Sequence, residues 1–297
     1  MISAMLKTTV RTVLERIPPA SELLRRRRMR RRFPNEMALL EGRSRPPGSG
    51  TSVVLFTQHK CASVYTREVF RTLACDSGLI PVNFENLVFN GQVSPRERER
   101  IYGAGGKAVY PERGYCFAPI RAWHAGIPDP ENYRTVLMLR DPRDVLVSFY
   151  FSMAYSHSVP EADRTMREQV LAERQTATGA DIDSYVIERS GFFLETYENY
   201  LRHVFGRPNV LFVTYEQMVA DFEGWLNRVV EHCRFTPSPA TRERLVRESN
   251  FEVEKEDPTR HRRQVTPGDH RRKLRPETIE ALNQRFATVL ETLGYER

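Results

Sequence analysis

The sequence predicts an α/β fold, with a single domain in which helices flank a central parallel sheet. Three short apolar runs carry this prediction: "SVVLFT" (52–57), "TVLMLR" (135–140) and "NVLFVT" (209–214). Each run is continuous rather than alternating, which is typical of strands that are buried on both faces. A turn and a helical pattern follow each run, and this alternation favours parallel strands joined by right-handed crossovers.

Composition places a boundary near the start of the first strand. The clearest linker is "SRPPGSG" (44–50), so we expect a basic arm and linker over residues 1–50 and the domain over 51–297. Residues 1–47 carry twelve Lys and Arg against four Asp and Glu, a net charge of +8. Because the whole chain carries +7, the remainder is close to neutral, at −1.

The arm contains "RRRRMRRRF", with seven arginines from Arg25 to Arg32. Two interpretations stay open for this run. It is either a solvated, poorly ordered lead-in, the commoner case, or an attachment to a polyanion or an acidic membrane surface. Apolar residues before the run recur at helical intervals, which predicts a basic amphipathic helix lying on the domain or on a membrane. These residues are Met5, Leu6, Val10, Val13, Leu14 and Ile17.

The remaining elements are less strongly patterned. A fourth strand is expected at "GYCFAP" (114–119). The charged region from His157 to Arg189 predicts a mobile lid or substrate-facing insertion, followed by a packed helix, "SYVIERSGFFLETYENYL" (184–201). The last helix, "PETIEALNQRFATVLETLG" (276–294), has Pro in its first turn and Gly after its end.

The chain lacks the patterns of membrane-spanning and secreted proteins. No apolar run approaches the roughly 20 residues that span a bilayer, and no signal-peptide pattern opens the sequence. Neither metal-ligand nor disulfide spacing relates the four cysteines, which are Cys61, Cys75, Cys116 and Cys233. We therefore expect a reduced, cytoplasmic protein, with peripheral attachment to a membrane through the arm as an open alternative.

Three loops should meet at the carboxyl edge of the sheet, where ligands bind in open α/β folds. They are Gln58–Ser63, Arg140–Asp144 and the region around Tyr215. The first loop opens a helix near Ala62 or Ser63, and the free N–H groups of a helix start suit a phosphate. Lys60 lies within this loop, but the glycines of an ATP-binding Walker motif are absent.

The second loop places Arg140 at the end of a buried strand, where an unpartnered charge is costly. Asp141 is a predicted N-cap, followed by proline at the first helical position. Ser148 lies two turns into the helix, so Arg140 and Ser148 could grip one phosphate from two sides. The alternative is a structural ion pair of Arg140 with Asp141 or Asp144, with Ser148 merely packed.

Together the two loops resemble the superfamily of sulfotransferases that use 3′-phosphoadenosine 5′-phosphosulfate (PAPS). The family's first signature, "YPKSGTTW", is similar to "QHKCASVY" (58–65). The resemblance implies that Lys60 contacts the bridging oxygen of the donor and that Tyr65 stacks on adenine. It implies a backbone cradle for the 5′-phosphate at Cys61, Ala62, Ser63 and Val64. Here the family's Gly and both of its Thr are replaced.

The second signature, "R-x-P-x-D-x-x-x-S", is matched by Arg140 and Ser148 as ligands of the 3′-phosphate. The third, "R-K-G-x-x-G-D-W", resembles "RQVTPGDH" (263–270), which keeps Arg263 and the Gly268–Asp269 turn. Weaker similarities imply that Tyr215 contacts the adenine edge. They also imply that Ser249 supplies a hydroxyl and Phe251 a stacking ring. The resemblance covers about residues 51–297 and implies a sulfotransferase fold related to P-loop nucleotide kinases.

The resemblance implies sulfuryl transfer from PAPS to a hydroxyl or amine of a small-molecule, lipid or carbohydrate acceptor. Adenosine 3′,5′-bisphosphate is then the product, and no metal is needed if Lys60 and the helix start supply the charge. The family's "KTHLP" motif for the general base has no clean match. His124 is the nearest histidine in that region, and its ordinary pKa suits the task. The open alternatives are His157, Glu85, Glu112 and Asp129, and Arg121 is either an acceptor-binding cation or an exposed charge.

Two other functional classes of protein stay open for this sequence. A P-loop-type kinase shares the sheet and the phosphate loop and would need ATP and Mg²⁺, but the missing Walker glycines speak against it. A non-catalytic binder of polyanions or nucleic acid would use the Arg-rich arm and show a steep salt dependence. The near-neutral domain makes nucleic acid an unfavoured partner for residues 51–297.

Overall fold

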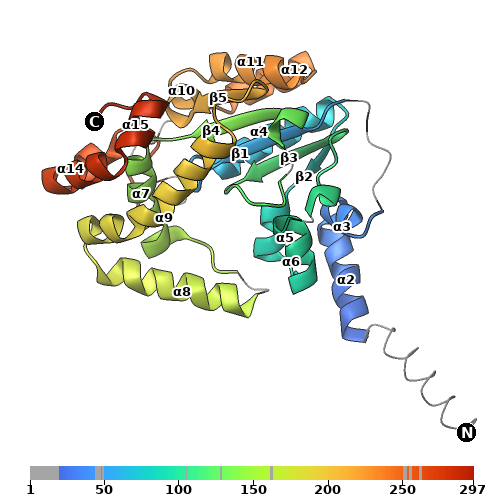
Figure 1. Ribbon diagram of the computed structural model, residues 1–297, viewed down its shortest axis with the longest axis horizontal. Helices are drawn as coiled ribbons and strands as arrows, with labels where there is room; N and C mark the ends of the chain where they lie inside the picture. The colour runs from blue at the N-terminus through green and yellow to red at the C-terminus, as the bar shows by residue number, and fades with distance from the viewer. Residues whose placement is uncertain are drawn as a thin grey trace, which may run out of the picture.

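The computed structural model describes residues 20–43, 48, 50–104, 106–127, 129–160, 163–249, 253, 256–260 and 263–297. Its centre is a five-stranded sheet in the order β2-β3-β1-β4-β5 (Figure 1), and all neighbouring strands run parallel. The strands are β1 (Val53–Thr57), β2 (Ile80–Val82), β3 (Tyr115–Ile120), β4 (Arg134–Leu139) and β5 (Val210–Thr214). The predicted α/β fold with a parallel sheet is confirmed.

The continuous apolar runs form the inner part of this sheet. The predicted runs at 52–57, 135–140 and 209–214 correspond to β1, β4 and β5, and the fourth expected strand is β3. All five residues of β1 are buried, because β3 and β4 pair with its two edges and helices cover both faces. Strand β2 was not predicted: it has three residues, one of them Pro81, and lies at the sheet's edge, where proline is tolerated.

Helices follow the strands as the pattern predicted. Helix α4 (Ser63–Asp76) follows β1, and α7 (Pro142–Phe151) follows β4. The Asp141 side chain caps α7 by accepting a hydrogen bond from the backbone N–H of Arg143. The helical pattern after β5 divides into α10 (Tyr215–Ala220) and α11 (Phe222–Cys233), because the Asp221 side chain caps a new helix at the N–H of Gly224.

The two faces of the sheet are covered by different helices. Leu55 of β1 belongs to a buried cluster that includes Val69 of α4 and Trp225 of α11. Phe56, which points to the opposite face, shares a second cluster with Tyr200 of α9 (Ile182–His203). Because successive side chains of a strand point to opposite faces, β1 contributes to both cores.

The expected insertion from His157 to Arg189 contains α8 (Arg164–Gly179) and the start of α9. The expected last helix is divided at Phe286 into α14 and α15. The remaining helices are α5 (Phe84–Asn90), α6 (Pro95–Tyr102), α12 (Pro239–Arg247), α13 (Asp269–Lys273), α14 (Pro276–Arg285) and α15 (Ala287–Leu293). Short 3₁₀ turns span Gly106–Val109 and Pro130–Asn132, and a π-helical turn spans Ser152–Ser156.

The arginine run differs from the expectation of a poorly ordered lead-in. It lies in α2 (Ala20–Arg32), which is followed by α3 (Pro34–Leu40). Apolar side chains of both helices join the cluster that holds Phe56; they are Met29, Phe33, Met37, Leu39 and Leu40. Residues 22–43 therefore pack as part of the domain, although the proposed boundary separated them from it. The amphipathic segment from Met5 to Ile17 lies outside the described residues.

No helix in the described part of the chain is long and apolar enough to cross a membrane. The four cysteines are free, and all except Cys75 are buried.

Candidate functional site

The loop after β1, which is the predicted phosphate cradle, contains two left-handed residues that are not glycine. Lys60 and Ala62 both have left-handed backbones, with φ of 67° and 55°, and α4 begins at Ser63. A left-handed residue with a side chain costs about 1–2 kcal/mol. Ala62 stands where the family signature has glycine, so the loop keeps the backbone shape at the expense of strain.

Cys61 is a packing residue of this loop. Its side chain is completely buried, and its backbone N–H donates to the carbonyl of Gln58 at 3.3 Å. Burial raises the pKa of the Cys61 thiol to about 12. The thiol therefore stays protonated near neutral pH and is no nucleophile.

Four cations gather around the loop. Burial, together with the positive charges of Arg140, Arg121 and Arg263, lowers the pKa of Lys60 to about 8. Among the ion pairs between described residues, none involves the Lys60 ammonium. A cluster of like charges that depresses a lysine's pKa is suited to bind a ligand with several negative charges.

Arg140 retains a hydrogen-bond donor of its own. Its side chain is 4% exposed, Nη1 donates to the Lys60 carbonyl at 3.2 Å, and Nη2 lies 3.4 Å from Oδ2 of Asp144. The guanidinium stacks 4.3 Å from the centre of the Tyr215 ring. Its Nε is buried and has no hydrogen-bond partner. The predicted Arg140–Asp144 contact is present, and one donor remains for a ligand.

Asp144 joins the second loop to the C-terminal motif. Its carboxylate is fully buried and accepts hydrogen bonds from the N–H of Gly268 at 2.8 Å and of His270 at 2.9 Å. Nδ1 of His270 lies 2.7 Å from the same carboxylate. Burial alone would raise the pKa of Asp144, but the His270 hydrogen bonds and the Arg140 charge hold it well below its usual range. Asp144 thus fixes both segments that carry the predicted phosphate ligands.

Arg263 is placed by carboxylates and an aromatic ring. It is 7% exposed, pairs with Glu256 and Asp269, and lies 4.1 Å from the centre of the Phe151 ring. The turn expected at Gly268–Asp269 is present, with Gly268 at φ 79°. The hydroxyl of Tyr215 donates to the Val265 carbonyl at 2.7 Å and ties this segment to β5.

Other predicted donor residues are placed less closely. Ser148 is partly exposed on α7, and its hydroxyl makes no hydrogen bond with another described residue. The Tyr65 ring packs edge-on against Phe222, with ring centres 5.9 Å apart, and Val64 is exposed. The Ser249 hydroxyl bonds back to the Val246 carbonyl at 2.6 Å, at the end of α12. Phe251 lies outside the described residues.

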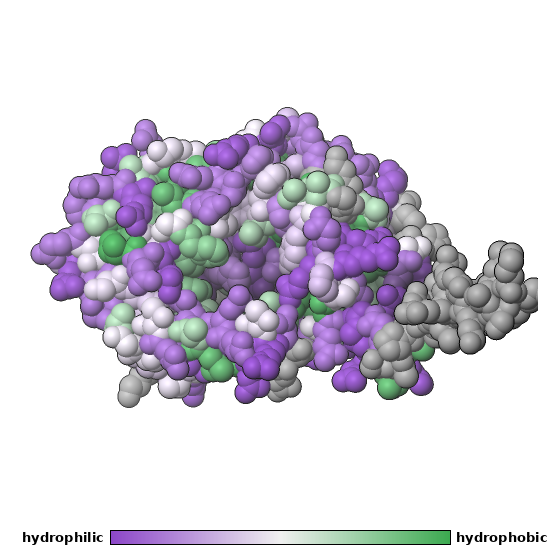
Figure 2. Space-filling model, turned by 60° about the horizontal axis from the view of Figure 1, so that its bottom comes forward, coloured by the Kyte–Doolittle hydropathy of each residue, from purple (hydrophilic) through white to green (hydrophobic). Residues whose placement is uncertain are grey.

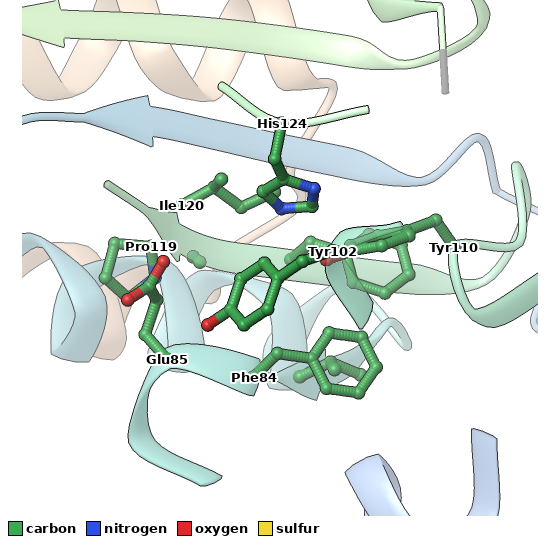
Figure 3. A pocket seen from close by; sticks show the side chains of 10 residues that line it. Phe84, Glu85, Tyr102, Tyr110, Pro119, Ile120 and His124 are labelled. Carbon is green, nitrogen blue, oxygen red and sulfur yellow. The ribbon is translucent and has the colours of Figure 1, made fainter. Parts of the chain in front are cut away.

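A pocket with aromatic walls lies beside the cradle. Its polar lining residues are Glu85, Tyr102, Tyr110 and His124 (Figure 3), and it has room for about one water molecule. In Figure 3 the Glu85 carboxylate and the Tyr102 hydroxyl approach each other from one side, and the His124 ring lies across from them. Burial raises the pKa of Glu85 and lowers the pKa of His124 to about 4. The Nδ1 atom of His124 is buried and has no hydrogen-bond partner.

Arg121 connects this pocket to the cradle. Its Nε donates to the Ser63 hydroxyl at 3.1 Å, and its backbone N–H donates to Glu85 at 3.3 Å. Nη1 of Arg121 also lies 3.8 Å from the Glu85 carboxylate. The sequence left Arg121 as either an acceptor-binding or an exposed charge, whereas the structure makes it a partly buried bridge between helix α4 and Glu85.

Two of the other candidate bases lie away from the loop that holds Lys60. Glu112 and Asp129 precede β3 and β4, at the amino edge of the sheet, opposite the cradle. There the Glu112 carbonyl accepts from the N–H of Ser52 at 2.8 Å. The third, His157, follows the π-helical turn, and its ring packs edge-on against Phe89. It lies near the loop, since burial and the charges of Arg121, Lys60 and His157 lower the pKa of His59.

Two tyrosines of α9 form hydrogen bonds at the carboxyl ends of the sheet's strands. Neither was predicted as a site residue. The hydroxyl of Tyr197 donates to the Arg140 carbonyl at 2.5 Å, and that of Tyr200 donates to the Thr57 carbonyl at 2.5 Å. Their spacing of three residues in "ETYENYL" puts them on one face of a predicted helix. That spacing was the only signal, and it does not reveal that the hydroxyls reach strand ends.

Figure 2 shows a hollow near the middle of one face of the molecule, with hydrophilic residues on its floor. It lies between the part that carries α8 and the part that carries α5 and α6 (Figure 1). The described residues hold no group of three or more His, Cys, Asp or Glu side chains that could bind a metal ion.

Comparison with known proteins assigns the family. The model of the sulfotransferase domain matches residues 129–294, more than half of the chain. The chain therefore belongs to the sulfotransferase family and is an enzyme of the PAPS-dependent superfamily, as the resemblance implied. No curated protein sequence matches the chain.

Solved structures with a similar fold include mouse sulfotransferase SULT7A1 complexed with PAP, at 14% identity and TM-score 0.49, covering 85% of this chain and 87% of that chain. A retinol dehydratase in complex with retinol and PAP gives 17% identity and TM-score 0.46, with 82% of each chain covered. A sulfotransferase from Alicyclobacillus acidocaldarius gives 12% identity and TM-score 0.38, covering 84% of this chain and 98% of that chain. The family assignment rests on the domain model, not on these similarities.

The strained backbone at Ala62 can be tested by restoring glycine. We expect Ala62→Gly to raise the free energy of unfolding by about 0.5–1 kcal/mol, because relief of the left-handed strain exceeds the added chain entropy. Ala74→Gly, inside the helix α4 that Ala62 precedes, is the control, and it should lower stability by about 1 kcal/mol or more. Urea denaturation measures both. A loss of stability in Ala62→Gly equal to that in the control would contradict the strained cradle.

Proposed function

We propose that this protein transfers a sulfuryl group from PAPS to a hydroxyl or amine of a small-molecule, lipid or carbohydrate acceptor. The observation that carries the proposal is the cation cluster of Lys60, Arg121, Arg140 and Arg263 at the start of helix α4. PAPS carries a phosphosulfate and a 3′-phosphate, and this cluster offers positive charge to both. The family assignment supports the reaction class.

The donor's 5′-phosphate would lie against the backbone from Cys61 to Tyr65. Arg140 and Ser148 would hold the 3′-phosphate, with the free Nε of Arg140 as a donor. Arg263 would also contact the 3′-phosphate, which would replace one of its carboxylate partners. Tyr65, Tyr215, Ser249 and Phe251 remain proposed contacts of the adenosine.

Lys60 stabilises the charge that develops on the departing phosphate. When bound, PAPS supplies an activated sulfuryl group on a phosphate leaving group. A positioned ammonium at the bridging oxygen lowers the barrier because its attraction grows as the bond breaks. The anionic donor would also restore the Lys60 pKa toward its ordinary value, which keeps the side chain protonated. In this proposal Lys60 and the helix start provide the charge without a metal ion.

We assign the general base to the pocket beside the cradle, with His124 as the base. Because its pKa lies near 4, the imidazole is neutral at pH 7, and its unpartnered Nδ1 can accept the acceptor's proton. Glu85 is the alternative in the same pocket, but Arg121 already engages its carboxylate. The free cysteines support a cytoplasmic location.

The donor assignment is tested by nucleotide binding. Adenosine 3′,5′-bisphosphate should raise the melting temperature more than AMP does, and more than ATP with Mg²⁺. Arg140→Ala should weaken bisphosphate binding about 10- to 100-fold, the usual worth of a charged hydrogen bond, while AMP binding changes little. Arg134→Ala, at the amino end of the same strand, is the control. Equal losses of affinity for both nucleotides would contradict the 3′-phosphate assignment. Stronger stabilisation by ATP with Mg²⁺ would favour a kinase.

Lys60→Ala should lower transfer from labelled PAPS at least 100- to 1,000-fold, because the leaving oxygen loses its cation. The free protein should be no less stable, since the change removes a positive charge from a repulsive cluster. Melting temperature without ligand therefore separates a catalytic loss from misfolding. Turnover at the wild-type rate would reject the role of Lys60.

The base is tested by the pH dependence of kcat/KM, which reports the free enzyme. His124 must be unprotonated, so the rate should fall as the pH drops through about 4. Lys60 must be protonated, so the rate should fall as the pH rises through about 8. His124→Gln should lower kcat 100- to 10,000-fold and remove the acid limb. If only Glu85→Gln does so, the base is Glu85.

A further inference from the structure

The outward face of α2 combines exposed leucines with unpaired arginines. Leu23 and Leu24 are 52% and 60% exposed. Arg27, Arg28 and Arg31 are also exposed, and none of the three forms an ion pair or hydrogen bond with another described residue. At 3.6 residues per turn, spacings of three and four residues place these five side chains on one side of the helix. We call them the α2 face.

The opposite side of α2 fixes how this face is presented. Met29 and the following Phe33 are buried against the domain. Arg25 pairs with Glu22 and with Glu97 of α6, and Arg32 donates to the Asn90 carbonyl at 3.2 Å. The helix is thus held by its inner side. Its outer side remains exposed, with both leucines and three arginines.

We propose that the α2 face docks on the surface of a bilayer that contains anionic lipids. Leucine side chains gain from entering the boundary between headgroups and acyl chains, and arginines attract anionic headgroups while their stems stay near the apolar layer. A nucleic acid or other polyanion would engage the arginines but would leave both leucines in water. The combination of the two residue types therefore favours a lipid surface.

The helix is suited to lie on a bilayer and not to cross it. It has 13 residues, seven of them arginine, whereas a spanning helix needs about 20 apolar residues. The net charge of +8 over residues 1–47 adds attraction to an anionic surface. Docking does not depend on the donor site, so this inference stands or falls separately from sulfuryl transfer.

Vesicle flotation of the full-length protein tests the proposal at physiological salt. We expect binding to phosphatidylcholine vesicles that contain phosphatidylserine and little binding to pure phosphatidylcholine. Each arginine near an anionic surface contributes roughly a fivefold gain in affinity, so the triple change Arg27→Gln, Arg28→Gln and Arg31→Gln should cost about 100-fold. The matched control changes Arg164, Arg260 and Arg297 to Gln, which lowers the net charge equally at exposed sites elsewhere.

The leucines are tested by Leu23→Ser with Leu24→Ser. This pair should lose most vesicle binding, whereas the exposed pair Leu171→Ser with Phe192→Ser should lose little. Melting temperatures should be unchanged in every variant, because all these side chains are exposed. Equal binding to neutral vesicles, or equal losses in the arginine variant and its control, would overturn the proposal. So would an unchanged leucine variant, which would indicate a polyanion, or leucine-dependent dimers in sedimentation without vesicle binding.

Discussion

The buried carboxylate of Asp144 is the contact on which the arrangement of the donor site depends. It accepts two backbone N–H groups from residues 268–270, meets the His270 ring and faces Arg140. A lone carboxylate at this depth would be strongly disfavoured. Its partners come from segments more than 120 residues apart in sequence, so folding the carboxylate into the core forces those segments together. The residues that we propose as phosphate ligands on both segments are thereby brought close together.

The second constraint is the electrostatic repulsion between Lys60 and the arginines around it. A fold under no functional demand would place acidic side chains beside Lys60. Yet the ion pairs of the described residues leave its ammonium out, and burial together with three guanidinium groups lowers its pKa. The left-handed backbone of Ala62 adds strain at the same loop. Strain and like charge cluster where a ligand would relieve them, because an anion compensates the cations and uses the N–H groups that the loop exposes.

Tyrosine hydroxyls stabilise the edge that carries this strain. Tyr197 and Tyr200 cap the carbonyls of Arg140 and Thr57, the residues at which β4 and β1 give way to the two loops. Tyr295, near the C-terminus, donates to Glu216, which in turn accepts the N–H of Asp141. Helix α9 and the C-terminal segment thus set the loop geometry, although neither contributes a charge to the cation cluster.

Four of the five strands and the two proposed donor loops could be predicted from the amino-acid sequence. Continuous apolar runs marked β1, β4 and β5, and the spacing of Arg140 and Ser148 marked the second loop, because both are local patterns along the chain. It missed β2, whose three residues are too few for a periodic signal, and it separated α2 and α3 from the core. Met29 and Phe33 stand in an arginine-rich segment, so the sequence did not indicate that they are buried. They pack in one cluster with residues of α5 and α6.

Which charged side chains lie together became clear from the folded structure. It turned Arg121 into a bridge between Ser63 and Glu85, put Glu112 and Asp129 at the far edge, and brought Arg263 to Lys60. Such contacts join residues far apart in sequence, and their distances follow from strand order and helix packing rather than from any local pattern. The charge of each residue follows from the sequence, but the residues that it contacts depend on the fold.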